Sequence, residues 1–129
     1  MAGQYDVVLD AVFGFSFSGA PRPPFDTILE SLKRSQTPVV SVDIPSGWSV
    51  DEGDVSGGGF QPQMLISLTA PKMSARFFTG PHHFLGGRFV PPGIAVKYNL
   101  QLPSYPGTEQ CVRLEDWPRE TKLTDKADL

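Results

Sequence analysis

Residues 39–47 have the sequence Val39-Val40-Ser41-Val42-Asp43-Ile44-Pro45-Ser46-Gly47, an apolar run that ends in an acid and a turn. The run is rich in β-branched residues and has no helical period, which predicts a strand buried on both faces of a parallel sheet. Asp43 would then lie at the carboxyl end of the strand, where open α/β sheets bind their ligands. The residues alone leave two interpretations equally open: Asp43 takes part in chemistry, or it accepts backbone N–H groups of its own turn.

A second apolar run, Tyr5 to Phe13, also carries an acid, Asp10, toward its carboxyl end. Residues 14–20 follow as a loop of small residues and hydroxyls, whose backbone amides can wrap a phosphate group. The prolines at positions 21, 23 and 24 lack the N–H donors that the start of a helix offers to anions. We therefore expect the loop itself to supply such donors.

An amphipathic helix is predicted over residues 25–34, because apolar residues stand at i, i+3, i+4 and i+7 counted from Phe25. Asp26 near its start and Lys33 near its end have the signs that suit the helix dipole. The order strand, loop, helix, strand is that of a βαβ unit with parallel strands. We expect strands over residues 6–12, 39–43 and 64–68 to form one sheet, with the helix packed on it.

The rest of the chain gives weaker signals. Residues 48–62 are rich in glycine and aspartate and are expected to be a flexible surface connection. From Phe84 the chain is expected to be one more extended piece, which includes residues 87–90. Lys72 could meet the negative charge of a ligand, although a solvated lysine is the commoner case. His82 and His83 would point to opposite faces of a strand and have no cysteine or acid at ligand spacing, so a metal site there is disfavoured.

Length and composition restrict the class of protein. A chain of 129 residues forms one domain at most, and a formal net charge of −3 with no basic stripe argues against a nucleic-acid partner. The sequence has no apolar run long enough to span a bilayer and no leader pattern, so we expect a cytoplasmic protein without a membrane partner. The single cysteine, Cys111, cannot form an internal disulfide and is expected to be structural or exposed.

Four motifs follow one another along the chain: Asp10-Ala11-Val12-Phe13-Gly14-Phe15-Ser16-Phe17-Ser18-Gly19, Val42-Asp43-Ile44-Pro45-Ser46-Gly47-Trp48, Thr69-Ala70-Pro71-Lys72 and Gly86-Gly87-Arg88-Phe89-Val90-Pro91-Pro92. Together they resemble the NAD(P)H-hydrate epimerase family, whose domain is of the YjeF N-terminal type. Animal members of this family are also called apolipoprotein A-I-binding proteins. The resemblance covers roughly residues 5–114.

This resemblance implies an α/β fold, a three-layer Rossmann-like architecture with a mainly parallel sheet. The family's domain begins with further strands and helices, including an Asn- and Gly-rich loop, that have no counterpart in these motifs. The resemblance therefore implies a partial domain over residues 1–114, truncated at the N-terminal side. Residues 115–129 are charged and without period, and we expect them to be a polar, disordered tail.

The implied activity is that of an isomerase in metabolite repair, which interconverts the R and S epimers of hydrated NADH and NADPH. The resemblance places Asp10 and Ser46 on a potassium ion and Asp43 against the substrate, as the candidate general acid/base. It places the dinucleotide on Gly14, Phe15, Ser16, Phe17, Ser18, Gly19 and Ala20, the last of which offers only its backbone. Carboxylates that end neighbouring strands, roughly 5 Å apart, also favour a cation bound by hard oxygen ligands.

Two other functions compete with this one. Gly14 to Ser18 is one residue short of the Gly-x-Ser-x-Gly nucleophile elbow, but prolines precede the helix, so a hydrolase with Ser16 as nucleophile is disfavoured. The stronger alternative is a non-catalytic protein that binds apolipoprotein A-I, because a shortened domain is expected to be a poor epimerase. The expected partners are thus hydrated NADH or NADPH, with apolipoprotein A-I and a second copy of the chain as further candidates. Family members are also mitochondrial or secreted.

Overall fold

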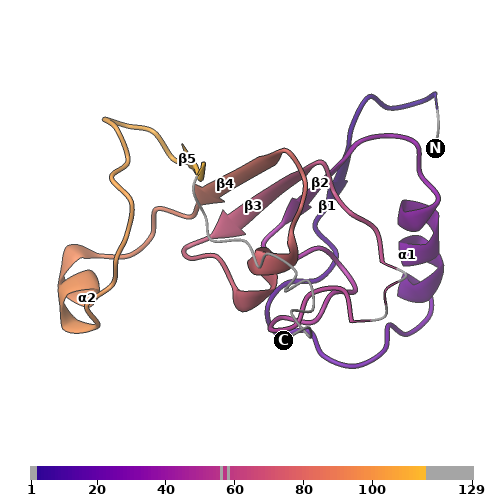
Figure 1. Ribbon diagram of the computed structural model, residues 1–129, viewed down its shortest axis with the longest axis horizontal. Helices are drawn as coiled ribbons and strands as arrows, with labels where there is room; N and C mark the ends of the chain where they lie inside the picture. The colour runs from indigo at the N-terminus through magenta and orange to yellow at the C-terminus, as the bar shows by residue number, and fades with distance from the viewer. Residues whose placement is uncertain (1–2, 56, 58, 116–129) are drawn as a thin grey trace, which may run out of the picture.

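The computed structural model describes residues 3–55, 57 and 59–115, which build a mostly parallel sheet with helices beside it (Figure 1). Its strands are β1 (Val8–Asp10), β2 (Val39–Val42), β3 (Met64–Leu68), β4 (His82–Gly86) and β5 (Val112–Arg113), in spatial order β1-β2-β3-β4-β5. The first four strands are parallel, and β5 runs antiparallel to β4. The predicted α/β class and the three predicted parallel strands are confirmed, although β1 is shorter than the apolar run that contains it.

Helix α1 (Phe25–Lys33) connects β1 to β2 and completes the predicted βαβ unit. It buries Leu29 and Leu32 against Val39 of β2 and Phe60 in one apolar cluster, which we call the α1 cluster. Asp26 and Lys33 stand in its first and last turns, as the sequence predicts. The helix therefore holds β1 and β2 together. The positions of Asp10 and Asp43, at the ends of these two strands, depend on this packing.

A second apolar cluster lies under the short 3-10 helix η1 (Met73–Phe77) and contains Ile44, Trp48, Leu65, Ala75 and Phe78; we call it the η1 cluster. The Trp48 side chain is buried, and its indole N–H donates to the carbonyl oxygen of Phe60 over 3.2 Å. Because both ends of residues 48–62 supply core side chains, the expectation of a mere surface connection was wrong there.

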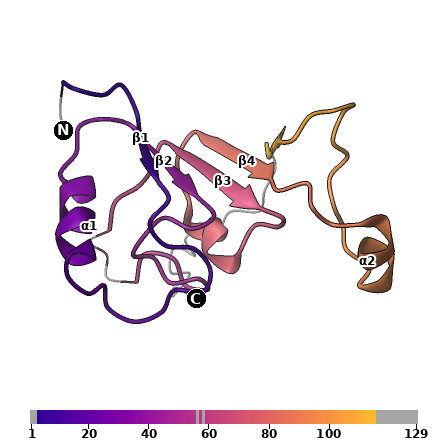
Figure 2. The same ribbon diagram turned by 180° about the vertical axis from the view of Figure 1, so that it is seen from behind.

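The C-terminal part differs from the sequence-based expectation. The fourth strand contains the start of the extended piece predicted from Phe84 but ends at Gly86, because Gly87 turns the chain with a φ of 73°. Helix α2 (Pro92–Lys97) has no counterpart among the predicted elements, although proline is well suited to the first turn of a helix. It buries none of its residues and stands apart from the sheet, on the far side from α1 (Figure 2).

Two further expectations can be placed against the structure. His82 is exposed and His83 is buried, so the two side chains do point to opposite faces, and the Nε2 atom of His83 lies 2.8 Å from the Ser67 hydroxyl. The expected tail at 115–129 lies outside the described residues except for Glu115. Within the described part of the chain, no helix is both long and apolar enough to cross a membrane.

Candidate active site at the ends of the parallel strands

Strands β2, β3 and β4 are each followed directly by a residue with positive φ: Asp43 at 69°, Thr69 at 67° and Gly87 at 73°. After Asp43 and Thr69, the next backbone N–H donates to the carbonyl two residues earlier, over 2.9 and 2.7 Å respectively. Such tight turns with positive φ are rare and strained, above all for the β-branched Thr69. Strain of this kind concentrates at functional sites, so these strand ends are where a site is sought.

The two non-glycine turns have a common sequence pattern. Asp43 and Thr69 are each followed, two residues later, by a proline and, three residues later, by a polar residue, Ser46 or Lys72. Each polar residue reaches back to an acid at the end of the preceding strand. The Ser46 backbone N–H donates to Asp10 Oδ2 over 2.8 Å, and Lys72 Nζ donates to Asp43 Oδ1 over 2.7 Å. Each turn thus supports the acid of its neighbouring strand.

Asp10, at the end of β1, is buried with only 1% of its surface exposed. Its Oδ2 atom accepts the Ser41 hydroxyl and the Ser46 N–H, both over 2.8 Å, whereas among the described residues Oδ1 has only the Val12 N–H at 3.5 Å. No lysine or arginine of the described ranges lies within ion-pair distance of this carboxylate. Asp10 is therefore a buried carboxylate held by neutral donors.

Asp43 is held from two sides and is 8% exposed. Lys72 Nζ donates to its Oδ1 atom over 2.7 Å, and the Phe15 backbone N–H donates to its Oδ2 atom over 3.2 Å. The interpretation that Asp43 serves only its own turn was wrong, because both partners come from other segments. One of them belongs to the loop at 14–20, which the sequence singled out for the dinucleotide.

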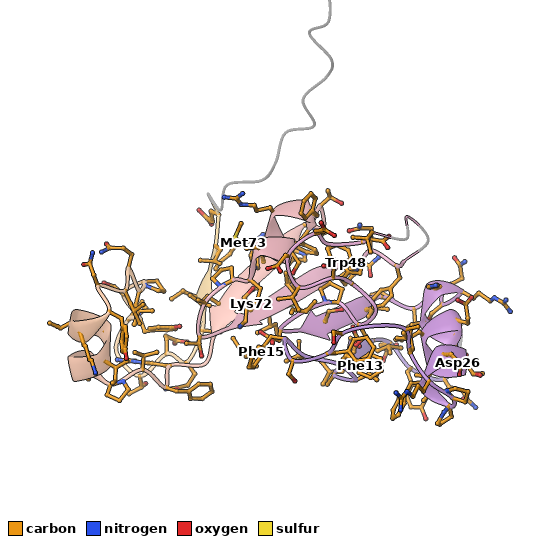
Figure 3. All side chains as sticks on the ribbon, turned by 90° about the horizontal axis from the view of Figure 1, so that it is seen from below. Phe13, Phe15, Asp26, Trp48, Lys72 and Met73 are labelled. Atoms are coloured by element: carbon orange, nitrogen blue, oxygen red, sulfur yellow. The ribbon has the colours of Figure 1, made fainter. Side chains whose placement is uncertain are left out.

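Lys72 is the site residue that sequence reasoning undervalued. A solvated side chain was considered the commoner outcome, yet its side chain is only 22% exposed and also donates to the carbonyls of Leu68 and Ala70. Its ammonium nitrogen lies 5.7 Å from the ring centre of Phe15, and the two side chains are neighbours in Figure 3. The shared proline spacing of the two turns is the signal that could have paired Lys72 with Asp43.

A cleft of about 630 Å³ is lined by Phe15, which contacts both members of this ion pair, although neither Asp43 nor Lys72 lines the cleft itself. Residues 15–19 line one side, and residues 47–51 with Val55 line the other. Five of the seven residues predicted to hold the dinucleotide are thus brought together, whereas Gly14 and Ala20 lie outside the lining. The opposite wall was missed, because its Gly- and Asp-rich sequence indicates only a connection.

Stacked aromatic rings anchor the loop at 14–20. The rings of Phe13 and Phe17 are stacked with centroids 3.8 Å apart and an interplanar angle of 11°, and Phe25 of α1 lies 5.5 Å from Phe13. The Phe13 N–H also donates to the Ser46 hydroxyl oxygen over 3.0 Å. The loop is therefore joined to both the helix and the β2 turn, which fixes the wall that it presents to the cleft.

Comparisons with known proteins agree with this geometry. Residues 1–74 match the family described as YjeF-related protein N-terminus, so the chain belongs to that family. It is 55% identical over 112 residues to an NAD(P)H-hydrate epimerase of Puccinia graminis f. sp. tritici, covering 87% of this chain and 46% of that protein. It is 57% identical over 128 residues to pyridoxine/pyridoxamine 5'-phosphate oxidase 1, chloroplastic, of Arabidopsis thaliana, covering 92% and 24%.

A solved structure supports the same assignment. The crystal structure of the yeast protein YNL200c matches with a TM-score of 0.78 and 40% identity, over 84% of this chain and 46% of that one. The predicted fold family is thereby confirmed. The chain spans less than half of the length of each of these three proteins.

Proposed function

We propose that this protein is an NAD(P)H-hydrate epimerase, which interconverts the R and S epimers of hydrated NADH and NADPH. The observation that carries the proposal is the doubly held Asp43 carboxylate, joined through the Phe15 N–H to one wall of the cleft. The 55% identity to a protein named for this activity supports it. An epimerase needs an acid/base at a fixed position beside a bound dinucleotide, and this arrangement offers both parts.

Asp43 is the proposed general acid/base, which would carry a proton to or from the hydrated ring carbon or its hydroxyl. A positioned group of this kind contributes on the order of 10² to 10⁴ in rate, provided that the substrate is within hydrogen-bond reach. Asp43 meets the requirement for position because its two oxygens are engaged by different segments.

The cleft suits the dinucleotide in size and in chemistry. Its volume of about 630 Å³ lies within the range that is usual for small-molecule sites. The rings of Phe15 and Phe17 offer stacking surface for a base, and the hydroxyls of Ser16 and Ser18 offer hydrogen bonds to ribose or phosphate. Asp51 is the one charged side chain among the described lining residues, so backbone amides would take the phosphates.

We propose a potassium ion at Asp10 and Ser46. The donor set fits, because a buried carboxylate with neutral donors lacks a counter-charge and Asp10 Oδ1 has only one long contact. Carboxylate and hydroxyl oxygens are hard ligands of the kind that such ions prefer. The bound ion would supply a fixed positive charge beside the substrate site. Thermal unfolding in KCl and in NaCl at equal ionic strength should show a potassium-specific stabilisation that Asp10→Ala abolishes; an unchanged potassium effect would contradict the site.

The function is tested by following epimer interconversion with the purified chain and with Asp43→Asn. We expect the substitution to lower kcat by about 10²- to 10⁴-fold, because the amide cannot exchange the proton. Asp26→Asn is the matched control, since Asp26 lies in the first turn of α1 and does not line the cleft. A wild-type chain that leaves both epimers unchanged would refute the proposal and leave the apolipoprotein A-I partner as the prediction to test.

A further inference from the structure

We propose that Lys72 is a positioning residue for Asp43, which holds the carboxylate aimed while taking no part in proton transfer itself. The inference rests on the proposed function, because it assigns the support of that site's acid/base. It begins from the ion pair of 2.7 Å between Lys72 Nζ and Asp43 Oδ1, in which 22% of the lysine and 8% of the aspartate side chain are exposed.

The ammonium group of Lys72 has all three of its N–H donors engaged. Beside Asp43 Oδ1, it donates to the Leu68 carbonyl over 2.8 Å and to the Ala70 carbonyl over 3.2 Å. An ammonium has three donors and no acceptor, so a fully engaged one has no N–H left for a substrate. Lys72 therefore acts through Asp43 and not directly on the ring.

Both carbonyls belong to the strained turn at the end of β3, which fixes where the ammonium lies. Leu68 is the last residue of β3, and the Ala70 N–H donates to its carbonyl over 2.7 Å, around Thr69 with positive φ. The turn thus presents two oxygens toward the end of β2. This gives the strained backbone a role, because it holds a cation next to the acid of the neighbouring strand.

The position of Asp43 is completed by Phe15. Lys72 donates to Asp43 Oδ1, so Asp43 Oδ2 accepts the Phe15 N–H. The Phe15 ring also lies near the ammonium group of Lys72. A charge-assisted hydrogen bond is stronger than one between neutral groups, which strengthens the hydrogen bond from the Phe15 N–H. Lys72 therefore couples the position of Asp43 to the loop that lines the cleft.

The test compares Lys72→Met and Lys72→Arg with the wild-type chain by two measurements. The first is the chemical shift of the Phe15 amide in ¹H–¹⁵N NMR spectra, which reports its hydrogen bond to Asp43 without any substrate. The second is kcat and KM for epimer interconversion. Lys97→Met is the matched control, because Lys97 also lies over an aromatic ring, that of Tyr98 at 5.3 Å, but on α2.

In Lys72→Met, we expect the Phe15 amide resonance to shift, because Asp43 loses the partner that aims it. We expect kcat to fall about 10²-fold at unchanged KM, the cost of a misplaced catalytic group. Lys72→Arg keeps the charge and should return the resonance toward its wild-type position. If both variants lower kcat alike and leave the Phe15 resonance unmoved, Lys72 is merely structural and the proposal is overturned. If the wild-type chain is inactive but the resonance still moves in Lys72→Met and returns in Lys72→Arg, the proposed function fails while the positioning role stands.

Discussion

Thr69 illustrates how much one backbone torsion can cost. Its φ of 67° lies in a region that β-branched residues avoid, and glycine adopts such angles without that penalty. We expect Thr69→Gly to raise the free energy of unfolding by about 1 kcal/mol, measured by urea denaturation. Asn99→Gly is the control, because Asn99 also has a positive φ, of 49°, but asparagine tolerates it. A destabilised Thr69→Gly would mean that the threonine side chain contributes more than the strain costs.

At the same scale, the sequence indicated the acids of the site better than their partners. Asp10 and Asp43 were located correctly because an acid that closes an apolar run must lie at the rim of a parallel sheet. Lys72 was not assigned, because its partner is 29 residues away and the proline spacing that the two turns share points to the pair only when the two turns are compared with each other. The same holds for the Phe15 N–H, since backbone donors leave no mark in a sequence.

At the scale of elements, β1 is an edge strand with an apolar outer side. It pairs with β2 alone among the described strands. Val7, directly before β1, and Leu9, within it, have side chains that are 54% and 63% exposed. An uncovered edge of this kind favours pairing between chains. We expect self-association that rises with concentration and that Leu9→Lys suppresses, as measured by sedimentation velocity.

Val96→Lys provides the comparison for this prediction. Val96 is 81% exposed on α2, so the substitution removes an equally apolar side chain from a different surface. If Val96→Lys abolishes self-association and Leu9→Lys does not, the chains associate through α2 and the edge-strand prediction is wrong.

The elements also show where sequence patterns are informative. The strands β1 to β3 and the helix α1 were predicted because their hydrophobic periodicity and the turn residues that flank them indicate the same elements. Strand β4 begins with two histidines, which lack the apolar signature, although one of them is buried against Ser67. Helix α2 buries nothing, so no apolar face marks it in the sequence.

At the scale of the whole molecule, the two walls of the cleft belong to different apolar clusters. The wall at 15–19 is anchored through Phe13 in the α1 cluster, whereas the opposite wall is anchored through Trp48 and Val50 in the η1 cluster. A ligand that touches both walls binds only when the two clusters are correctly placed relative to each other. Ligand binding should therefore stabilise the whole fold and not one loop.

We expect a hydrated nicotinamide dinucleotide at about 100 times its Kd to stabilise the chain by about 2.7 kcal/mol. Phe17→Ala should weaken binding, because it removes the ring stacked on Phe13 that holds one wall. Trp48 lines the cleft, so its fluorescence in a Trp117→Phe background provides the binding signal, and urea denaturation provides the stability. Ile28→Ala is the control, since Ile28 is 41% exposed on α1 and outside the cleft. If the ligand changes Trp48 fluorescence without stabilising the fold, it contacts one wall only, and the two clusters are not coupled through the cleft.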